Sequence, residues 1–552
     1  MECTDFTGVE VKADVIIKNL VRRNFHRDSV QLLRLSESAK KIDGVTEAAI
    51  VMGTSTNKEI LAKLGLLTED GKVATDSDMI LAVGAESPGL IENALALIQE
   101  MILRPPASKG QSYYDVDAAL HALPDADLAV VSIPGEYAKE AVLKALGKGL
   151  SVHLFSDHVP AGDELELKRY ASERGLFVMG PGAGTLLLAG KAIGFANVVR
   201  KGKAGIVAAA GTGLQETSVL LSEAGVGVSA GLGTGGGDVK DKIGGIMMLQ
   251  SIDALENDAA TELILLISKP PDSKVKAKLL DHISTKGQKR YVTCFLGAEN
   301  YELPELSRNR VKGTKTLHAA VLQAIRSMER TGRVGAEKLF EIPPSDLIAR
   351  ADRIAKDLKP NQRYLRGLYT GGTLAYETLV ILDRMLGRGY SNAPLDSRPK
   401  LSNSNLSVEN SIVDLGEEEF TAGRAHPMID PTIRKLRLVE EAKDRDVAVI
   451  MMDVMLGYGS HPDPAGAMLE AITEARQIAK SDGRSLPILA HVCGTEQDPQ
   501  PLSQQVKKLE ERGVHIFPTN AMMAIAGALI ARKGEVSEAQ LRKIYEDLLG
   551  AY

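Results

Sequence analysis

The chain contains the same local pattern twice, and this internal repeat constrains its fold more than any other feature. Residues 205–225 read GIVAAAGTGLQETSVLLSEAG, and residues 367–387 read GLYTGGTLAYETLVILDRMLG. When the copies are aligned on Glu216 and Glu377, each predicts a short apolar strand, a turn of small residues ending in Gly-Thr, and a helix with apolar residues at helical spacing. We therefore expect two related domains, each built around one strand, one glycine turn and one helix.

The repeated turns have the chemistry of an anion pocket. Backbone N–H groups in a glycine turn before a helix point at one spot, and the positive end of the helix dipole adds to the attraction. A tight strand-to-helix turn without a ligand would look the same in one copy, whereas two copies with matched glutamates favour a site for a phosphorylated or carboxylated species between paired domains. The predicted anion-binding residues are Gly211, Thr212 and Gly213 in the first copy and Gly372 and Thr373 in the second.

Composition limits the classes of function. The 552 residues suffice for roughly three or four domains. The net charge of −6 leaves no electrostatic footprint for nucleic acid, and the 4% aromatic content offers few stacking platforms for bases. Cys3, Cys294 and Cys493 are far apart, the first residues lack a signal pattern, and no apolar run approaches the ~20 residues of a membrane span. These features predict a reduced, cytoplasmic protein without a membrane segment.

Short apolar runs alternate with amphipathic stretches along the chain, which is typical of parallel α/β units. The predicted fold class is α/β, with a Rossmann-like domain of the CoA-binding type at residues 12–196 followed by flavodoxin-like domains at 200–335 and 363–552. The last two should be related by internal pseudo-symmetry, because each starts from one copy of the repeat. Near the end of the chain, Ser537 with Gln540 three residues later predicts a capping box.

Longer blocks resemble a known superfamily. Residues 129–185 resemble the end of the CoA-binding domain of succinyl-CoA synthetase α subunits, and KAGIVAAAGTGLQETSVLLSEAGVGVSAGLGTGGG resembles the start of the α-subunit ligase domain. DVAVIMMDVMLGYGSHPDPAGAMLEAI resembles the C-terminal domain of the β subunit. Within this superfamily, GLYTGGTLAYE, DLGEEEFTAGRAHPMIDP, GYGSHPDPA and GTEQDPQ are similar to blocks of the FdrA group. The resemblance implies that α-type and β-type ligase domains are fused in one chain.

Three departures from acyl-CoA ligases bear on the reaction. The ATP-grasp half of the β subunit has no counterpart, and no GxxxxGK[ST] pattern replaces it. The stretch that corresponds to the ligase phosphohistidine segment, CFLGAENYELPELSRNR (294–310), contains no histidine. The first turn, NLVRRNFHRDSVQLL (19–33), lacks the glycines that let a backbone approach the CoA pyrophosphate. We therefore expect neither the phosphoryl relay of a ligase nor tight CoA binding, although weak CoA binding stays open.

Polar residues near the predicted strand ends complete the candidate site. In the resemblance, Glu216 and Glu377 match the glutamate that orients the ligase histidine, and here they would orient substrate or phosphate. These glutamates and His461 are the catalytic candidates; Lys269, Gly457 and Gly459 are further candidates for anion binding, and Arg424, His426, Asp430 and Asp463 for substrate binding. A structural role in a turn or cap is the alternative for the loop residues. The spacing of the histidines and aspartates fits no metal-ligand signature, so no metal site is predicted.

The resemblance implies three alternatives for function. FdrA-like proteins are implicated as one subunit of oxamate carbamoyltransferase, which would convert oxalurate and phosphate to oxamate and carbamoyl phosphate in allantoin degradation. We favour this transferase, because it needs a phosphate pocket and donors for an oxyanion but no ATP-grasp domain, phosphohistidine or CoA. The alternatives are an acyl-CoA synthetase similar to succinate–CoA ligase and a non-catalytic scaffold subunit. Phosphate or carbamoyl phosphate is then the expected small-molecule substrate, and other subunits of a hetero-oligomeric complex or further copies of the chain are the expected partners.

Overall fold

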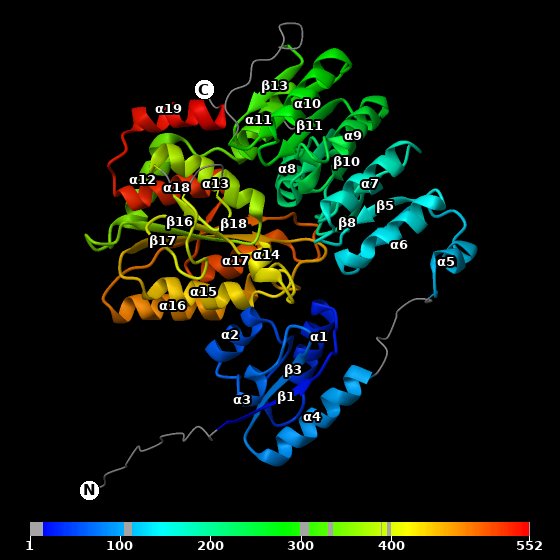
Figure 1. Cartoon of the computed structure of the whole chain (residues 1–552). Helices are drawn as coiled ribbons and strands as arrows, with labels where there is room; N and C mark the ends of the chain where they lie inside the picture. The colour runs from blue at the N-terminus through cyan, green and yellow to red at the C-terminus, as the bar shows by residue number, and fades with distance from the viewer. Residues whose placement is uncertain are drawn as a thin grey trace. The chain divides into compact units, whose positions relative to one another are not determined.

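The computed structural model describes residues 15–103, 113–297, 309–328, 335–387, 389–394 and 399–550. The chain forms two compact units (Figure 1). The first comprises Met1–Ser112 together with Glu417–Ile433, and the second comprises Tyr113–Gly416 together with Arg434–Tyr552.

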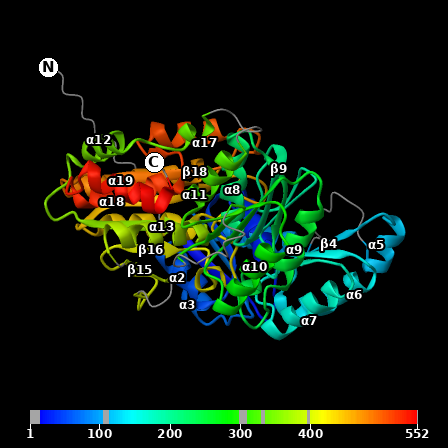
Figure 2. The same ribbon diagram turned by 90° about the horizontal axis from the view of Figure 1, so that it is seen from above.

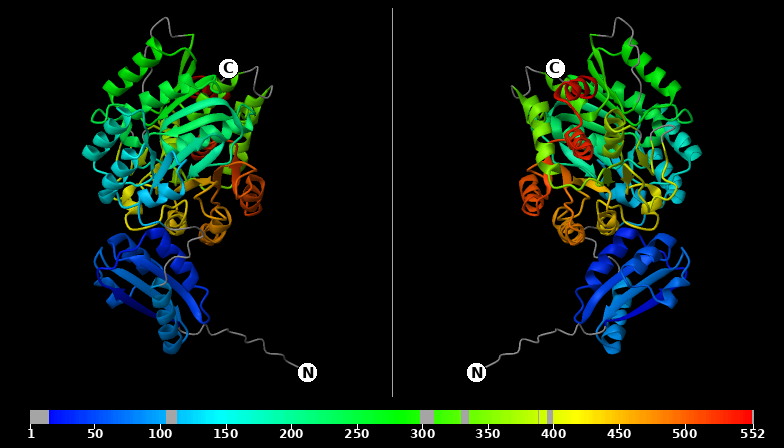
Figure 3. Two further views of the ribbon diagram at one scale, coloured as in Figure 1. Left: turned by 90° about the vertical axis from the view of Figure 1, so that its right-hand side faces the viewer. Right: turned by 90° about the vertical axis from the view of Figure 1, so that its left-hand side faces the viewer.

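The first unit is built around a small antiparallel sheet with the strand order β1-β3-β2. Its elements are β1 (Ile16–Arg22), α1 (Ser29–Ala39), β2 (Val45–Met52), α2 (Ser55–Lys63), α3 (Glu69–Lys72), β3 (Met79–Ala85) and α4 (Pro88–Leu103). Apolar residues of α1 and α4 pack on one face of the sheet (Figure 3, blue), and Leu61 of α2 packs on the other face. The returning segment with α14 (Glu418–Thr421) is attached here, since Asn57 Nδ2 donates to the Gly423 carbonyl over 3.1 Å.

This architecture corrects the prediction of a single Rossmann-like domain at residues 12–196. Three strands form in this region, but β3 lies between the other two and pairs antiparallel with both. Every residue of β3 is buried, as expected for any central strand covered on both faces. A continuous apolar run indicates such burial and does not indicate strand direction, so the sequence alone favoured the wrong sheet.

The remainder of the predicted Rossmann-like block lies in the second unit. The strands β4 (Leu128–Val131), β5 (Ser151–Leu154) and β6 (Val178–Met179) form a parallel sheet. After α5 (Val116–Ala122), the helices α6 (Gly135–Gly147) and α7 (Ala161–Ser172) connect these strands. Residues 113–179 thus form a small β-α-β-α-β layer of the kind expected.

The two copies of the repeat build parallel sheets with the same strand order, which confirms the predicted α/β fold class. The first sheet runs β10-β9-β11-β12-β13, and the second runs β16-β14-β17-β18-β19. The first contains β9 (Lys201–Ala209), β10 (Val228–Gly233), β11 (Leu263–Ser268), β12 (Arg290–Phe295) and β13 (Val311–Thr314), extended by the hairpin of β7 (Thr185–Leu188) and β8 (Lys191–Gly194). The second contains β14 (Tyr364–Tyr369), β16 (Ser411–Asp414), β17 (Val447–Met455), β18 (Ile488–Cys493) and β19 (His515–Phe517), extended by β15 (Tyr390–Ser391).

Four buried helices pack on one another within the second unit (Figure 2). They are α8 (Gly211–Glu223), α11 (Leu317–Ser327), α13 (Gly372–Met385) and α18 (Asn520–Arg532). Apolar and small residues cover nearly their whole circumference, which is typical of interior helices. More exposed helices include α9 (Ile246–Asn257), α10 (Ser273–Thr285), α12 (Pro344–Ala355), α15 (Thr432–Lys443), α16 (Leu469–Ser481), α17 (Leu502–Glu511) and α19 (Glu538–Leu549), whose predicted capping box is present.

A buried ion network joins α7 of the small layer to the first repeat. Lys168 is fully buried, and its Nζ donates to Glu164 over 2.8 Å, to Asp238 over 3.0 Å and to the Thr234 carbonyl over 2.9 Å. Asp238 also accepts hydrogen bonds from the backbone N–H groups of Met247 and Met248 at the start of α9. Because one ammonium group serves two buried carboxylates, removing it would leave both without their cation.

We expect Lys168→Ala to destabilise the protein by about 3–5 kcal/mol, since breaking a buried ion pair leaves an uncompensated charge. The measurement is the shift in the urea unfolding midpoint. Lys443→Ala serves as the control because Lys443 forms an exposed pair with Glu440 over 2.7 Å, and such pairs contribute about 0.5 kcal/mol or less. Equal shifts in the two variants would show that the Lys168 network does not hold the layer in place.

Candidate functional site

The starts of α8 and α13, the helices labelled in Figure 1, contact each other. The two glycine turns therefore lie side by side. The backbone N–H of Thr373 donates to Thr212 Oγ1 over 3.2 Å. A Cβ atom placed on Gly213 would lie 2.8 Å from Thr373 Cγ2, and one on Gly371 would lie 3.1 Å from Thr212 Cβ. Real side chains do not tolerate such distances, so the glycines permit this approach. The structure therefore brings together the anion-binding residues predicted in the two repeats.

The two turns differ in what their N–H groups bind. Neither helix has a side-chain cap. In the second copy, however, Asp453 accepts hydrogen bonds from the N–H groups of Thr370 and Gly371 over 2.9 and 2.7 Å. The carboxylate of Asp453 is itself paired with Arg434 over 2.9 Å. The Asp453 carboxylate thus accepts hydrogen bonds from two backbone N–H groups of the second turn.

The sheet registers show that the first copy has no such acid. Val207 pairs with Leu266 in the first sheet, and Leu368, which corresponds to Val207, pairs with Met452 in the second. The residue after Leu266 is Ile267, and the residue after Met452 is Asp453. An apolar residue therefore replaces the acid next to the first turn, which leaves that turn better suited to an external anion.

Glu216 has a histidine partner that the sequence did not reveal. Its Oε2 lies 2.8 Å from Nε2 of His491, and both side chains are almost fully buried. The other ring nitrogen, Nδ1, lies 3.2 Å from the Phe517 carbonyl, which can only accept a hydrogen bond, so Nδ1 carries a proton. Burial lowers the pKa of His491 and the Glu216 carboxylate raises it, with a net rise. The pair therefore holds a proton beneath the start of α8.

Glu377 has different neighbours. Its carboxylate accepts hydrogen bonds from Asn520 Nδ2 over 2.8 Å and from the N–H of His318 over 3.2 Å. Burial raises the pKa of Glu377 to about 7, with a further rise from the charge of Glu216, although the hydrogen bond from Asn520 opposes it. A carboxyl group with this pKa can exchange a proton near neutral pH, as a general acid or base must.

The two repeats contribute to the site crosswise. Thr293 pairs with Leu266, and Ala490 pairs with Met452, so the next residues, Cys294 and His491, occupy equivalent positions. Burial raises the pKa of the Cys294 thiol, and the charge of Glu377 adds to the rise. Glu216 thus contacts a strand of the second repeat, and Glu377 accepts the N–H of His318 from α11, which follows the first sheet. A search for histidine in 294–310 missed His491 because the histidine lies in the equivalent strand of the second repeat.

Lys269, whose role in anion binding stays a prediction, lies beside the second turn. Its Nζ lies 4.3 Å from the centre of the Tyr376 ring on α13, a cation–π contact. A Cβ atom on Gly372 would lie 3.5 Å from the same Nζ and 2.4 Å from Asp414 Oδ2. A cation from the first repeat therefore stands beside the helix start of the second.

The loop after β17 has structural partners. Gly457 and Gly459 have φ angles of 98° and 80°, and Gly457 packs against the carbonyl of Ala196. His461 Nδ1 accepts the N–H of Asp463 over 2.9 Å, and Asp463 pairs with Lys508 over 2.7 Å. These contacts shape the loop and anchor it, and the structure does not join His461 or Asp463 to the glutamates. Their catalytic, anion-binding and substrate-binding roles stay predictions.

Arg424, His426 and Asp430 belong to the first compact unit, whereas the glutamates belong to the second. Arg424 pairs with Asp430 over 2.8 Å, and Asp430 also accepts the N–H of Thr432. Burial raises the pKa of Asp430 and the Arg424 charge lowers it, with a net fall. His426 Nδ1 accepts the N–H of Met428 over 3.2 Å. The three residues thus form a folded turn, and their role in substrate binding stays a prediction.

Across the described ranges, no three or more His, Cys, Asp or Glu side chains gather in a way that could hold a metal ion. None of the helices in the described residues is both long and apolar enough to cross a membrane.

Glu377 should make the stability depend on pH. Between pH 4.5, the ordinary pKa of a glutamate, and about 7, the folded chain keeps a proton on Glu377 that the unfolded chain has lost, so stability falls as pH rises through this window. Glu377→Gln cannot ionise. We expect it to match the wild type below pH 4.5 and to exceed its free energy of unfolding by up to about 3 kcal/mol above pH 7.

Urea titrations across this pH range measure the difference in the free energy of unfolding. The control is Glu440→Gln, at an exposed carboxylate that pairs with Lys443 among the described residues. A Glu377→Gln variant whose stability falls between pH 4.5 and 7 as much as that of the wild type would contradict a protonated Glu377.

Two protein-family models match parts of the chain. A CoA-ligase model matches residues 368–529, and a model described as AllF, heavy metal-associated domain, matches residues 15–117. The second description refers to heavy metals, but residues 15–117 contain no cysteine, the soft ligand that such metals favour. The residues of this domain therefore do not fit a thiolate-bound metal.

Full-length and partial relatives agree with these matches. The uncharacterized protein YahF of Escherichia coli is 40% identical over 521 residues, covering 94% of this chain and 99% of YahF. The α subunit of the ADP-forming succinate–CoA ligase of Methanothermobacter thermautotrophicus is 27% identical over 172 residues, covering 30% of this chain and 57% of that subunit. The α subunit of the malate–CoA ligase of Methylorubrum extorquens is 28% identical over 170 residues, covering 29% and 56%. The match thus spans just over half of each ligase subunit. Together with the fused pair of ligase-type domains, these relatives show that the chain belongs to the FdrA family of succinyl-CoA-synthetase-like proteins.

Proposed function

We propose that this protein catalyses acyl transfer of the CoA-ligase type, with the phosphate of an acyl phosphate bound at the start of α8. The observation that carries the proposal is the uncapped first turn of α8, which meets the start of α13 above the buried pair of Glu216 and His491. The ligase relatives and the CoA-ligase match at residues 368–529 favour this reaction class over the carbamoyl transfer that the sequence alone favoured.

The binding step uses backbone donors of α8 and one hydroxyl group. Thr212 Oγ1 already accepts the N–H of Thr373, so its own proton is available for donation to an anion. A Cβ atom on Gly211 would meet no heavy atom closer than 3.9 Å, which leaves space beside this turn. The helix dipole and the Lys269 ammonium then favour the negative charge that develops when an acyl phosphate is attacked.

Glu216 and His491 hold a proton near the bound anion. Both ring nitrogens of His491 are occupied, Nε2 by Glu216 and Nδ1 by the Phe517 carbonyl. Phosphorylation of Nε2 would require Glu216 to release it. We therefore assign His491 to proton transfer or charge stabilisation and do not assign it the phosphoryl-carrying role of the ligase histidine. Glu377, with its pKa of about 7, is the second group able to exchange a proton here.

Carbamoyl transfer is the second candidate. It is favoured by the lack of histidine in residues 294–310, where Cys294 stands opposite Glu377, and by the AllF-type domain at residues 15–117. The FdrA resemblance associates such proteins with oxamate carbamoyltransferase. The reaction would use the same phosphate pocket, because carbamoyl phosphate is itself an acyl phosphate, and it would need no phosphohistidine.

Two assays distinguish these reactions. The chain, with and without candidate partner subunits, is mixed with succinyl phosphate and CoA, and formation of the thioester with release of inorganic phosphate is followed. In parallel, it is mixed with oxamate and carbamoyl phosphate, and phosphate release is followed. We expect the thioester; phosphate release that depends on oxamate would establish carbamoyl transfer instead. If neither product forms with partners present, and Glu216→Ala leaves the activity of the complex unchanged, the chain is a scaffold.

Gly211→Val tests the anion pocket itself. The added side chain fills the space next to the first turn of α8 without a predicted clash with the backbone, so the fold should persist while activity falls by about 10²-fold or more. Gly162→Val is a matched control, because Gly162 lies in the first turn of α7 and a Cβ atom there meets nothing within 4 Å. Turnover measures the activity, and calorimetry measures the phosphate affinity. If both are unchanged in Gly211→Val, the anion pocket does not lie at the start of α8.

A further inference from the structure

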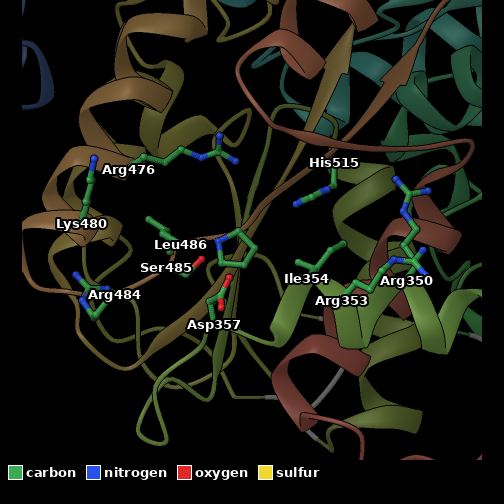
Figure 4. Close-up of a pocket in the computed structure, with 11 residues that line it drawn as sticks. Arg350, Arg353, Ile354, Asp357, Arg476, Lys480, Arg484, Ser485, Leu486 and His515 are labelled. Carbon is green, nitrogen blue, oxygen red and sulfur yellow. The ribbon is translucent and has the colours of Figure 1, made fainter.

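A second cavity lies at the opposite edge of the second sheet from the helix starts. Its volume is about 580 Å³, and it is lined by residues of α12, α16, the segment before β18 and the beginning of β19 (Figure 4). Since β18 begins at Ile488 and β19 at His515, the cavity lies where these strands begin. The α13 turn, in contrast, follows the end of β14 at Tyr369. The two sites are therefore on different edges of one sheet.

The lining is strongly basic. Five cationic side chains face one carboxylate, that of Asp357, and the cations are Arg350, Arg353, Arg476, Lys480 and Arg484. Figure 4 shows them on both sides of the cavity, with His515 above it. Burial lowers the pKa of His515, and the charges of Arg350 and Arg476 lower it further. Asp482 pairs with Arg484 and the charge of Glu510 acts on Arg350, so negative groups offset only part of the positive charge.

Backbone carbonyls hold several of these side chains in place without cancelling their charge. Arg350 donates to the Ile516 carbonyl over 2.8 Å, and its guanidinium lies 4.1 Å from the centre of the Phe517 ring. Arg476 donates to the Gly513 carbonyl over 2.6 Å. A carbonyl orients a guanidinium but carries no net charge, so these contacts hold the two cations in place and leave their positive charge.

Two other cations of the lining are not engaged. Within the part of the chain that the structure describes, the side chains of Arg353 and Lys480 have no hydrogen bond or ion pair. Arg484 differs, because it pairs with Asp482 over 3.1 Å and donates to the Ala442 carbonyl over 2.8 Å. The charges of Arg353 and Lys480 are therefore available to an anion in the cavity.

We propose that this cavity binds a small polyanion, a molecule with at least two phosphate or carboxylate charges. The guanidinium groups match the planar geometry of both kinds of oxyanion. The volume is larger than one inorganic phosphate needs and lies in the range of small-molecule sites. Ile354, Leu486 and Pro487 supply an apolar part of the lining for the uncharged portion of such a molecule.

Calorimetric titration of the full chain with ADP, pyrophosphate and citrate tests the proposal and distinguishes phosphate from carboxylate ligands. We expect at least one of them to bind with a stoichiometry of one at this cavity. Lys480→Glu should weaken that binding by about ten-fold or more, because it removes one charge-assisted contact and adds a repulsive one. Gly211→Val should leave it unchanged, since Gly211 lies at the other edge.

Lys507→Glu is the matched control. Lys507 is 76% exposed on α17, does not line the cavity, and its substitution changes the net charge of the chain by the same amount. The affinity of the Lys507→Glu variant for the bound anion should stay within about two-fold of the wild type, since exposed charges are screened by salt. The proposal is overturned if none of the three anions binds at millimolar concentration, if both lysine variants weaken binding equally, or if Gly211→Val abolishes it.

Discussion

The close approach of α8 and α13 is the contact on which the rest of the second unit depends. It requires that Gly213 and Gly371 have no side chain, because a Cβ atom on either would press against the opposite turn. When the helix starts meet, the Glu216 carboxylate of α8 reaches a strand of the second repeat, and the Glu377 carboxylate of α13 reaches the start of α11. A duplicated strand–turn–helix pattern thus becomes one shared site, and neither repeat could form it alone.

Pseudo-symmetry fixes the backbone of this site, and differences between the copies fix its chemistry. Asp453 satisfies the second turn, whereas Ile267 leaves the first without an acid. His491 pairs with Glu216, whereas its counterpart Cys294 gives Glu377 no basic partner. One glutamate is therefore held in an ion pair, and the other keeps its proton up to a pKa of about 7. The two copies thus give like carboxyl groups different surroundings, a histidine for Glu216 and neutral hydrogen-bond donors for Glu377.

The sequence predicted those parts of the fold that local pattern determines. Matching the copies on Glu216 and Glu377 was enough to predict two sheets of equal strand order, because the repeat fixes strand, turn and helix together. It could not predict the antiparallel β3, since its buried face pattern suits either direction. His491 was missed because its contact with Glu216 depends on which strand of the other repeat faces α8. This arrangement is set by the tertiary structure and not by local sequence. Arg424 and Asp430 were predicted to bind substrate, and the structure shows an ion pair between them that the spacing alone did not indicate.

One short strand connects the two candidate sites of the second repeat. The carbonyl of Phe517, at the end of β19, orients His491, while His515, at its beginning, lines the basic cavity. Arg350 contacts both the Ile516 carbonyl and the Phe517 ring. A three-residue strand spans only about 10 Å, and Arg350 therefore contacts the ring of the same residue whose carbonyl fixes the histidine proton. Parallel sheets place ligands at the ends of their strands. Here β19 contacts the proton-holding His491 at one end and the basic cavity at the other. The position of the strand is therefore constrained at both ends.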